Sequence, residues 1–374
     1  MRQLGVDITE TSSGVLQISG LGMNNFQQPH NRLDCGNAGT SLRLLLGLLA
    51  GSNVSAVLDG DDSLRRRPIN RVAIPLRQMG AAIETTDRGT CPVQIKGTKL
   101  SGIGYALPVA SAQVKSAILL AALSAEGETE IIEPTPTRDH TERMLISLGV
   151  PLTTSDCKVC TGPIDHIPAF DIEIPGDISS AAFIVVAALL LSDSEVVIDN
   201  VCLNPTRCGY LQILRRMGAD ISTDGVEIRR GEPVGKLVVK FSDLHSSRCD
   251  DIPVATFIDE VPVLALAATQ AEGVTRLFNL GELRVKESDR LSGILSILAA
   301  AGAKIHIEEN DLVIFGPTRL FPPLVDTRKD HRLAMLTETI SLISEERFLG
   351  TFEEEISISF PEYYSVMKHL IEGR

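Results

Sequence analysis

The strongest constraint on the fold of this chain is a repeat of about 70 residues, marked by a glycine that follows an amphipathic segment. Four segments share the pattern: LRQMGAAI (76–83), LISLGVPL (145–152), LRRMGADI (214–221) and LAAAGAKI (298–305). Their glycines are separated by 69, 69 and 84 residues, and Gly5 precedes the first of them by 75. Because a glycine after the last turn ends a helix in a left-handed conformation, each segment predicts a helix followed by a strand.

Five more apolar helices with small polar starts are predicted at 37–51, 111–127, 177–191, 259–273 and 330–344. A β-rich stretch follows each of them, at 54–60, 128–134, 195–201, 274–280 and 347–352, and a last helix is expected at 360–370. This alternation predicts an α/β fold with helices packed on sheets, in a chain of 374 residues that is long enough for two or more cores. Gly5 would close a sixth unit, whose first helix we expect upstream of Met1.

The formal net charge of −13 argues against a nucleic-acid partner, which requires a broad basic face. It leaves room for a small anionic substrate, because a local group of Arg and Lys can concentrate positive potential in one place. The longest apolar run, 181–191, is too short for a membrane span of about 20 residues and predicts a buried helix instead.

Seven cysteines, an odd number, and the lack of an apolar leader in residues 1–10 predict reduced thiols in the cytoplasm. Cys157 and Cys160 have CxxC spacing, but no second pair completes a zinc set, so we expect loop or strand thiols and no metal.

The densest group of charges is ELRVKESDRLSGIL, residues 282–295. If a helix begins near Ser288, Arg290 lies in its first turn, and with Lys286 and the helix N-terminus it forms an anion site. Glu287 lies among these cations and could transfer protons. The alternative is a solvated charged face with pairs of residues four apart.

Other predicted helices begin with groups that could bind anions. Asp330 can cap a helix whose first turn carries Arg332, and Arg67 precedes Pro68 at another helix start. The small polar starts 37–43 and 110–113 offer backbone N–H groups, although ordinary N-capping explains each of them alone. Asp259 could likewise be only a cap. If the repeats pack around a pseudo-axis, these ends converge on a substrate with several phosphate or carboxylate groups.

Seven motifs in order resemble the 5-enolpyruvylshikimate-3-phosphate synthase family: LDCGNAGTSLR, GDDSLRRRP, SAQVKSA, TRDHTERM, IDEVPVLALAA, LRVKESDR and DHRLAM. SAQVKSA, TRDHT and KESDR are closer to the bacterial class II subgroup than to the plant and enteric one. The enolpyruvyl transferase of cell-wall UDP-sugars shares this fold, but its loop cysteine is not evident here.

The resemblance implies two domains of three βαβαββ units each, over residues 1–173 and 174–374, with the active site in the cleft between them. The first would be the shikimate-3-phosphate-side domain, and the second would carry the catalytic Asp, Lys and Glu. The implied reaction moves the enolpyruvyl group of phosphoenolpyruvate onto the 5-hydroxyl of shikimate 3-phosphate, through a tetrahedral intermediate, and releases phosphate. The resemblance further implies a monomer that needs no metal or organic cofactor.

The same resemblance implies roles for individual residues. Asp259 would take the hydroxyl proton, Glu287 would carry protons to and from the methylene carbon, and Lys286 would assist. Phosphoenolpyruvate would bind Arg67, Gln113, Arg290, Arg332, Gly39 and Asn37. Shikimate 3-phosphate would bind Ser111, Ala112, Gln113, Arg138, Thr137, Asp259 and Lys286. A larger residue at Gly39 is associated in the family with weaker glyphosate binding, so we expect glyphosate sensitivity here.

One family motif, of the form PGSKSxSxR, is expected upstream of residue 1, and its Lys, Ser and Arg would contact both substrates. Three explanations follow: a start placed too far downstream, a catalytically impaired chain, or a segment supplied by another chain. The alternative in a different functional class is a repeat scaffold that binds small phosphorylated ligands without turnover.

Overall fold

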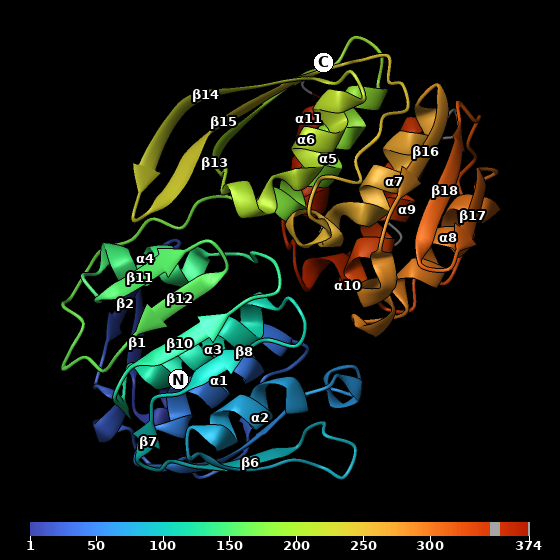
Figure 1. Cartoon of the computed structure of the whole chain (residues 1–374). Coiled ribbons are helices and arrows are strands. Elements are labelled where there is room, and N and C mark those ends of the chain that lie inside the picture. The colour runs from blue at the N-terminus through green and yellow to red at the C-terminus, as the bar shows by residue number, and fades with distance from the viewer. Residues whose placement is uncertain (345–351, 373–374) are drawn as a thin grey trace. The chain divides into compact units, whose positions relative to one another are not determined.

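The computed structural model describes residues 1–344 and 352–372, and the chain divides into two compact units, Met1–Asp171 and Ile172–Arg374. Figure 1 colours unit 1 from blue to green and unit 2 from green to red. The predicted stretch 347–352 falls, apart from Phe352, outside the described residues. None of the helices in the described ranges combines the length and the apolar character that a membrane span requires.

Unit 1 contains four helices and four small sheets (Figure 1). The helices are α1 (Gly39–Ala50), α2 (Asn70–Gln78), α3 (Ala112–Ala122) and α4 (His140–Ser147). One sheet has the order β3 (Leu33–Asp34), β4 (Ser55–Asp59), β6 (Val93–Lys96), β5 (Ala82–Glu84). A second has the order β11 (Leu152–Ser155), β12 (Lys158–Thr161), β10 (Thr129–Ile132), β8 (Gly104–Ala106). The two-stranded sheets are β1 (Asp7–Ser12) with β2 (Val15–Ser19), and β7 (Leu100–Ser101) with β9 (Ala125–Glu126).

The described part of unit 2 has two three-stranded antiparallel sheets (Figure 1). Their orders are β13 (Glu195–Cys202), β15 (Glu232–Lys240), β14 (Asp220–Arg229) and β16 (Gly273–Leu277), β18 (Asp311–Gly316), β17 (Lys304–Glu308). Its helices are α5 (Ile178–Leu190), α6 (Gly209–Arg216), α7 (Val261–Gln270), α8 (Arg290–Ala300), α9 (His331–Ile343), α10 (Glu353–Ser357) and α11 (Tyr363–Glu372). Short 3₁₀ helices η4 (Pro205–Arg207), η5 (Val254–Thr256), η6 (Ile258–Glu260) and η7 (Leu280–Val285) connect these elements.

The predicted repeat is confirmed in the sheet topology. In all four larger sheets the strand after the first helix pairs with the last strand of the repeat, which in turn pairs with the strand after the second helix. A parallel strand is added before the first helix in unit 1, as β3 on β4 and β8 on β10. In unit 2 the corresponding parallel contact shrinks to the single bridges Gly176–Val201 and His245–Glu272. The observed architecture is therefore α/β, with repeated βαβαββ units.

The five predicted helix-ending glycines all adopt positive φ, from 84° to 105°. After each of the four second helices, the glycine N–H bonds the carbonyl three residues back and the next N–H bonds the carbonyl five residues back. This is the Schellman arrangement, which satisfies the last carbonyls of a helix and turns the chain into a strand. The glycine spacing was therefore a correct signal for the repeat.

Small residues bring the central helices close together. A Cβ on Gly47 of α1 would lie 2.2 Å from the carbonyl oxygen of Ala117 on α3, so only glycine fits at this crossing. In unit 2 the helices α5, α7 and α9 contact one another pairwise and are buried almost all round. The run 181–191 lies mostly within α5 and is a buried helix, as predicted. Aliphatic residues dominate both cores, in keeping with a chain that lacks tryptophan.

Candidate active site

In unit 2 the carboxylate of Asp259 is the centre of a group of cations. Asp259 lies in η6, just before α7, and is 8% exposed. Its Oδ1 lies 3.1 Å from Lys286 Nζ and 3.6 Å from Arg290 Nη1, and its Oδ2 lies 3.5 Å from Arg207 Nη1. The alternative that Asp259 only caps the next helix does not hold, because Glu260 is the N-cap residue of α7 and no side chain caps it.

The KESDR segment places Lys286 and Glu287 in the link between η7 and α8. The helix begins at Arg290, and Asp289 caps it by accepting from the Ser292 N–H at 3.1 Å, so the start expected near Ser288 is shifted by one to two residues. Arg290 Nη2 donates to Glu287 Oε2 at 2.5 Å. Since Arg290 is 1% exposed, the alternative of a solvated charged face is wrong for this residue.

Asp330 caps α9, as predicted, by accepting from the N–H groups of Arg332 and Leu333. It also receives the Arg290 Nε and Nη2 donors, at 3.0 and 3.1 Å. Burial alone would raise the pKa of Asp330, but the charge and hydrogen bonds of Arg290 outweigh it and hold this pKa below the ordinary value. Arg332 Nη1 donates to the backbone carbonyl of Asp259 at 2.9 Å.

Two buried residues of this cluster were not predicted from the sequence. Arg207, at the end of η4, and Glu260, the neighbour of Asp259, form an ion pair of 3.2 Å. Arg207 lies 52 residues before Asp259, and no local pattern links them. The Asn204–Pro205 pair before Arg207 is a local signal for the start of a helix, but it does not indicate a partner for Arg207.

In unit 1 the N-terminus of α1 lies beside Arg67. The N-cap residue Ala38 has no side-chain cap, so ordinary capping does not account for this helix start. Arg67 is 8% exposed, and its Nη2 donates to Asn37 Oδ1 at 2.7 Å, while Asn37 donates to Asp61. A Cβ on Gly39 would lie 2.8 Å from Arg43 Nη1 and 3.3 Å from Arg67 Nη1. Glycine therefore lets two guanidinium groups approach the helix start.

Gln113 joins the starts of α3 and α1. Its Oε1 accepts from Arg43, and its Nε2 donates to Thr40 Oγ1 at 2.7 Å. The hydroxyl of Ser111 is the N-cap of α3 and accepts from the Val114 N–H at 3.5 Å, so here capping does occur, and Ala112 is the first helical residue.

Thr137 and Arg138 lie in the loop between β10 and α4. Thr137 is buried and donates to Glu133, and Arg138 beside it is partly exposed. Glu133 also pairs with Lys115 of α3, at 2.8 Å. The loop is thus held against α3 by buried ions.

The seven cysteines are free thiols. Cys157 lies in the turn of the β11–β12 hairpin and Cys160 lies in strand β12, as expected for loop or strand thiols. Burial is the main cause that raises the pKa of Cys160.

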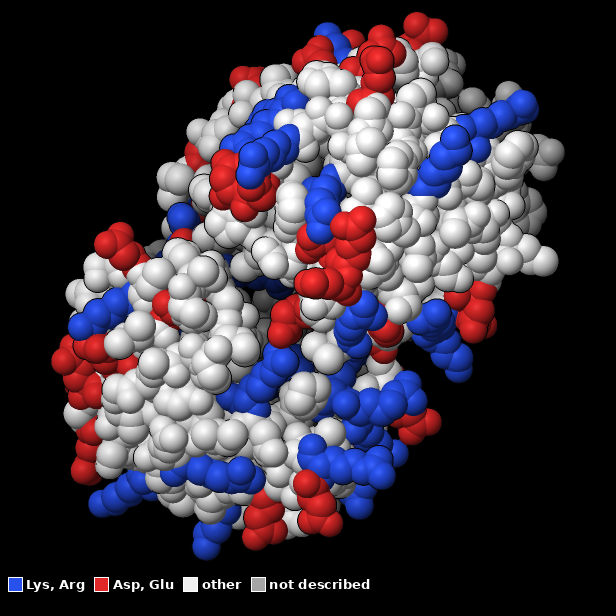
Figure 2. Space-filling view, turned by 45° about the vertical axis from the view of Figure 1, so that its right-hand side comes forward, with Lys and Arg blue, Asp and Glu red and all other residues white. Residues whose placement is uncertain are grey.

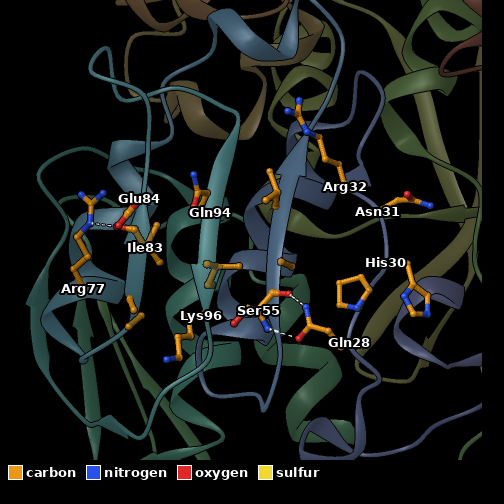
Figure 3. Close-up of a pocket in the computed structure, with 16 residues that line it drawn as sticks. Gln28, His30, Asn31, Arg32, Ser55, Arg77, Ile83, Glu84, Gln94 and Lys96 are labelled. Carbon is orange, nitrogen blue, oxygen red and sulfur yellow. Dashed lines mark hydrogen bonds between the residues drawn. The ribbon is translucent and has the colours of Figure 1, made fainter.

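On the face shown in Figure 2, Lys and Arg side chains gather over unit 1 despite the negative net charge. Arg65, Arg66 and Arg88 line a depression of about 580 Å³ next to Arg67 in the chain. A second depression of about 750 Å³ lies over the strands β4, β5 and β6 and contains none of the predicted site residues. In Figure 3 its charged side chains, such as Arg32, Arg77 and Lys96, lie apart from one another and do not point to one centre.

The two sets of residues suit different chemistry. In the unit 2 cluster the carboxylates of Asp259 and Glu287 contact cations, and carboxylates in such positions can exchange protons with a bound substrate. The unit 1 set offers guanidinium, amide and backbone N–H donors, which suit phosphate and carboxylate groups.

A family model described as EPSP synthase (3-phosphoshikimate 1-carboxyvinyltransferase) matches residues 1–367. A 3-phosphoshikimate 1-carboxyvinyltransferase of Thermus thermophilus is 49% identical over 375 residues, which are 99% of this chain and 86% of the relative. The protein of that name from Thermodesulfovibrio yellowstonii is 44% identical over 99% of this chain and 87% of its own length. The solved EPSP synthase of Acinetobacter baumannii has 40% identity and a TM-score of 0.86, covering 99% of this chain and 85% of that one.

Proposed function

This chain belongs to the EPSP synthase family, and from that premise we propose how its residues carry out the family's reaction. It is a 3-phosphoshikimate 1-carboxyvinyltransferase of the shikimate pathway, which supplies aromatic amino-acid biosynthesis. It transfers the enolpyruvyl group of phosphoenolpyruvate to the 5-hydroxyl of shikimate 3-phosphate and releases phosphate. The roles of individual residues are the proposal.

Asp259 takes the proton of the 5-hydroxyl of shikimate 3-phosphate while the hydroxyl oxygen attacks carbon 2 of phosphoenolpyruvate. The observation that carries this role is the placement of the Asp259 carboxylate within 3.1 to 3.6 Å of three cations. Cations so near favour the ionised form, the form that can accept a proton. Lys286 is the closest of them and assists the proton transfer.

Glu287, which begins the cycle in its protonated form, delivers a proton to the methylene carbon of phosphoenolpyruvate, which gives the tetrahedral intermediate. It later removes a proton from the resulting methyl group as the carbon–oxygen bond to phosphate breaks. Its 2.5 Å ion pair with Arg290 supports this role, since it ties the carboxylate to a buried and fixed guanidinium. One carboxylate can act as acid and then as base when addition and elimination follow each other.

The carboxylate and phosphate of phosphoenolpyruvate bind Arg67, Gln113, Asn37 and the Gly39 backbone of unit 1, and Arg290 and Arg332 of unit 2. The planar guanidinium fork matches both anionic groups. Shikimate 3-phosphate binds through Ser111, Ala112, Gln113, Thr137 and Arg138, with Asp259 and Lys286 at its reacting hydroxyl. Backbone N–H groups at the start of α3 support the phosphate contact.

Cytoplasmic location and a monomeric state belong to the same proposal. Seven free thiols support a reducing compartment. Size-exclusion chromatography with light scattering would test the monomer.

The test of the catalytic assignment is Asp259→Asn, assayed by phosphate release from phosphoenolpyruvate with shikimate 3-phosphate present. We expect a loss of about 10²- to 10⁴-fold, the usual value for a positioned acid or base. Asp251→Asn, at an exposed ion pair of the same unit, is the matched control. Turnover within threefold of the unaltered chain would reject the role of Asp259. Tight binding of shikimate 3-phosphate without turnover in the unaltered chain would favour the ligand-binding scaffold.

A further inference from the structure

Arg207 is a buried cation of the unit 2 cluster that has no part in the roles given above. One guanidinium contacts two consecutive carboxylates: Nη1 lies 3.5 Å from Asp259 Oδ2, and Nη2 lies 3.2 Å from Glu260 Oε1. Arg207 is 6% exposed and Glu260 is fully buried. Burying charges costs desolvation free energy that pairing only partly offsets, so stability alone does not explain this arrangement.

The residues on either side of Arg207 in the chain fix its position. Asn204 caps η4 through the Thr206 N–H at 2.8 Å, and Pro205 occupies the first helical position. Gly209 starts α6, and a Cβ there would lie 2.0 Å from the Oγ1 of Thr256 in η5. Glycine therefore permits the close approach of η4 to the segment that leads to Asp259.

Glu260 connects Arg207 to a second arginine. Its Oε1 also lies 3.6 Å from Arg332 Nη1, and Arg332 Nη1 donates to the Asp259 carbonyl. Asp259 is thus held at its side chain by Arg207 and at its backbone by Arg332, with Glu260 between the two guanidinium groups.

Arg207 is charged at every pH at which an enzyme works. Burial alone would lower its pKa, but Glu260, Asp259 and Asp177 outweigh burial and raise it above the ordinary value. Among the described residues, Lys286 and Arg290 also contact Asp259, and Glu287 and Asp330 pair with Arg290. Arg207 is the cation on the Oδ2 side of the carboxylate, whereas Lys286 and Arg290 lie on the Oδ1 side.

We propose that Arg207, anchored by Glu260, is a positioning residue that fixes the Asp259 carboxylate and keeps it ionised for proton transfer. The inference rests on the proposed role of Asp259. It adds a residue that touches the base and no substrate, so its loss should change the protonation of the base and not only the amount of active enzyme.

The test is the pH profile of kcat/KM between pH 4.5 and 9 for Arg207→Met and Arg207→Lys. An arginine next to an aspartate lowers the aspartate pKa by about 1–3 units. We therefore expect the acid limb of Arg207→Met to move up by about one pH unit, and that of Arg207→Lys to stay with the unaltered enzyme. Arg216→Met, at an exposed ion pair, is the control and also records the titration of the substrate phosphates. An equal loss at all pH values with an unmoved limb would overturn the proposal.

Two further variants cover misfolding. Arg207→Met alone leaves Glu260 buried without this partner, so the double variant Arg207→Met/Glu260→Gln removes both charges and should also move the acid limb upward. If circular dichroism shows that neither variant folds, Gly209→Ala tests the proposal instead. This variant keeps every charge, and its new methyl group displaces η4. It should also raise the acid limb, and an unmoved limb would reject the proposal.

The outcomes separate this inference from the one it rests on. If Asp259→Asn keeps its turnover, the assignment of the base is wrong and this inference falls with it. If Asp259→Asn is inactive and the limb stays in place in the Arg207 variants, only the positioning role of Arg207 is wrong.

Discussion

Arg290 and Asp330 are joined by two hydrogen bonds, of 3.0 and 3.1 Å, while their side chains are 1% and 0% exposed. They link the first residue of α8 to the N-cap of α9, 40 residues later. One buried ion pair therefore holds in one geometry the two helix starts to which we assign phosphoenolpyruvate binding.

Asp330→Asn should destabilise the fold by about 3–5 kcal/mol, because it leaves the buried guanidinium of Arg290 with one less carboxylate. Asparagine can still cap α9, so the loss reports the ion pair and not the cap. Urea unfolding measures the effect, and Asp251→Asn, at an exposed pair, should change stability by about 1 kcal/mol or less. Equal effects in the two variants would contradict this prediction.

Gly39→Ala should raise the KM for phosphoenolpyruvate several-fold and reduce inhibition by glyphosate, to which we expect the unaltered enzyme to be sensitive. The new methyl group would lie 2.8 Å from Arg43 Nη1 and 3.3 Å from Arg67 Nη1, so both guanidinium groups must move.

Steady-state kinetics at phosphoenolpyruvate near its KM, with rising glyphosate, would measure both effects. Gly20→Ala is the control, since a Cβ there meets nothing within 4 Å. Full activity of the unaltered enzyme at high glyphosate would contradict the expected sensitivity.

Lys115→Met should destabilise unit 1 by about 3–5 kcal/mol, because it removes the cation that pairs with two buried carboxylates, Glu133 and Glu142. Glu142→Gln should cost about 1 kcal/mol or less, since burial already raises the pKa of Glu142 against the pull of Lys115. Chemical denaturation at pH 7 distinguishes the two variants. A larger loss in Glu142→Gln than in Lys115→Met would refute this interpretation.

His331 should make the fold sensitive to mild acid. Burial first, and then the charges of Arg332 and Arg290, lower the pKa of His331 to about 4 from its ordinary value of 6.5. The unfolded chain therefore binds this proton more readily, so stability is complete above pH 6.5 and falls as the pH drops toward 4. We expect a loss on the order of 2 kcal/mol over that range.

His331→Gln should remove this part of the pH dependence in urea unfolding between pH 7 and 4.5. His306→Gln, at an exposed histidine, should not. The same slope in both variants would mean that His331 does not control the acid sensitivity.

The fold was predictable where the signal was local. A glycine at the end of a helix is a property of five or six residues, and all five such glycines have the predicted positive φ. Asp330 as the cap of α9 was predictable for the same reason. The start of α8 was placed one to two residues early because Ser288 and Asp289 are both good caps, and only the observed bond to Ser292 chooses Asp289.

The charged cluster was less predictable because its partners are far apart in the chain. Arg207 precedes Glu260 by 53 residues, and from the sequence Glu260 could be only a helix-start residue like its neighbour. Their pairing depends on how α6 packs against η5 at Gly209, a contact of tertiary structure that no local pattern encodes. The resemblance implied roles for Asp259 and its neighbours, but it gave no indication of Arg207 and Glu260, which contact them.

Among the residues that the structure describes, the ion pairs of the unit 2 cluster join as many carboxylates as cations. Four of each are joined in one network of ion pairs: Arg207, Lys286, Arg290 and Arg332 with Asp259, Glu260, Glu287 and Asp330. Each of these four cations already contacts a carboxylate, so a phosphate that binds one of them competes with that carboxylate. Substrate binding then becomes an exchange of partners. In the mechanism that we propose, Lys286 turns to a phosphate, so that Asp259 loses its nearest cation and becomes a stronger base as the hydroxyl arrives.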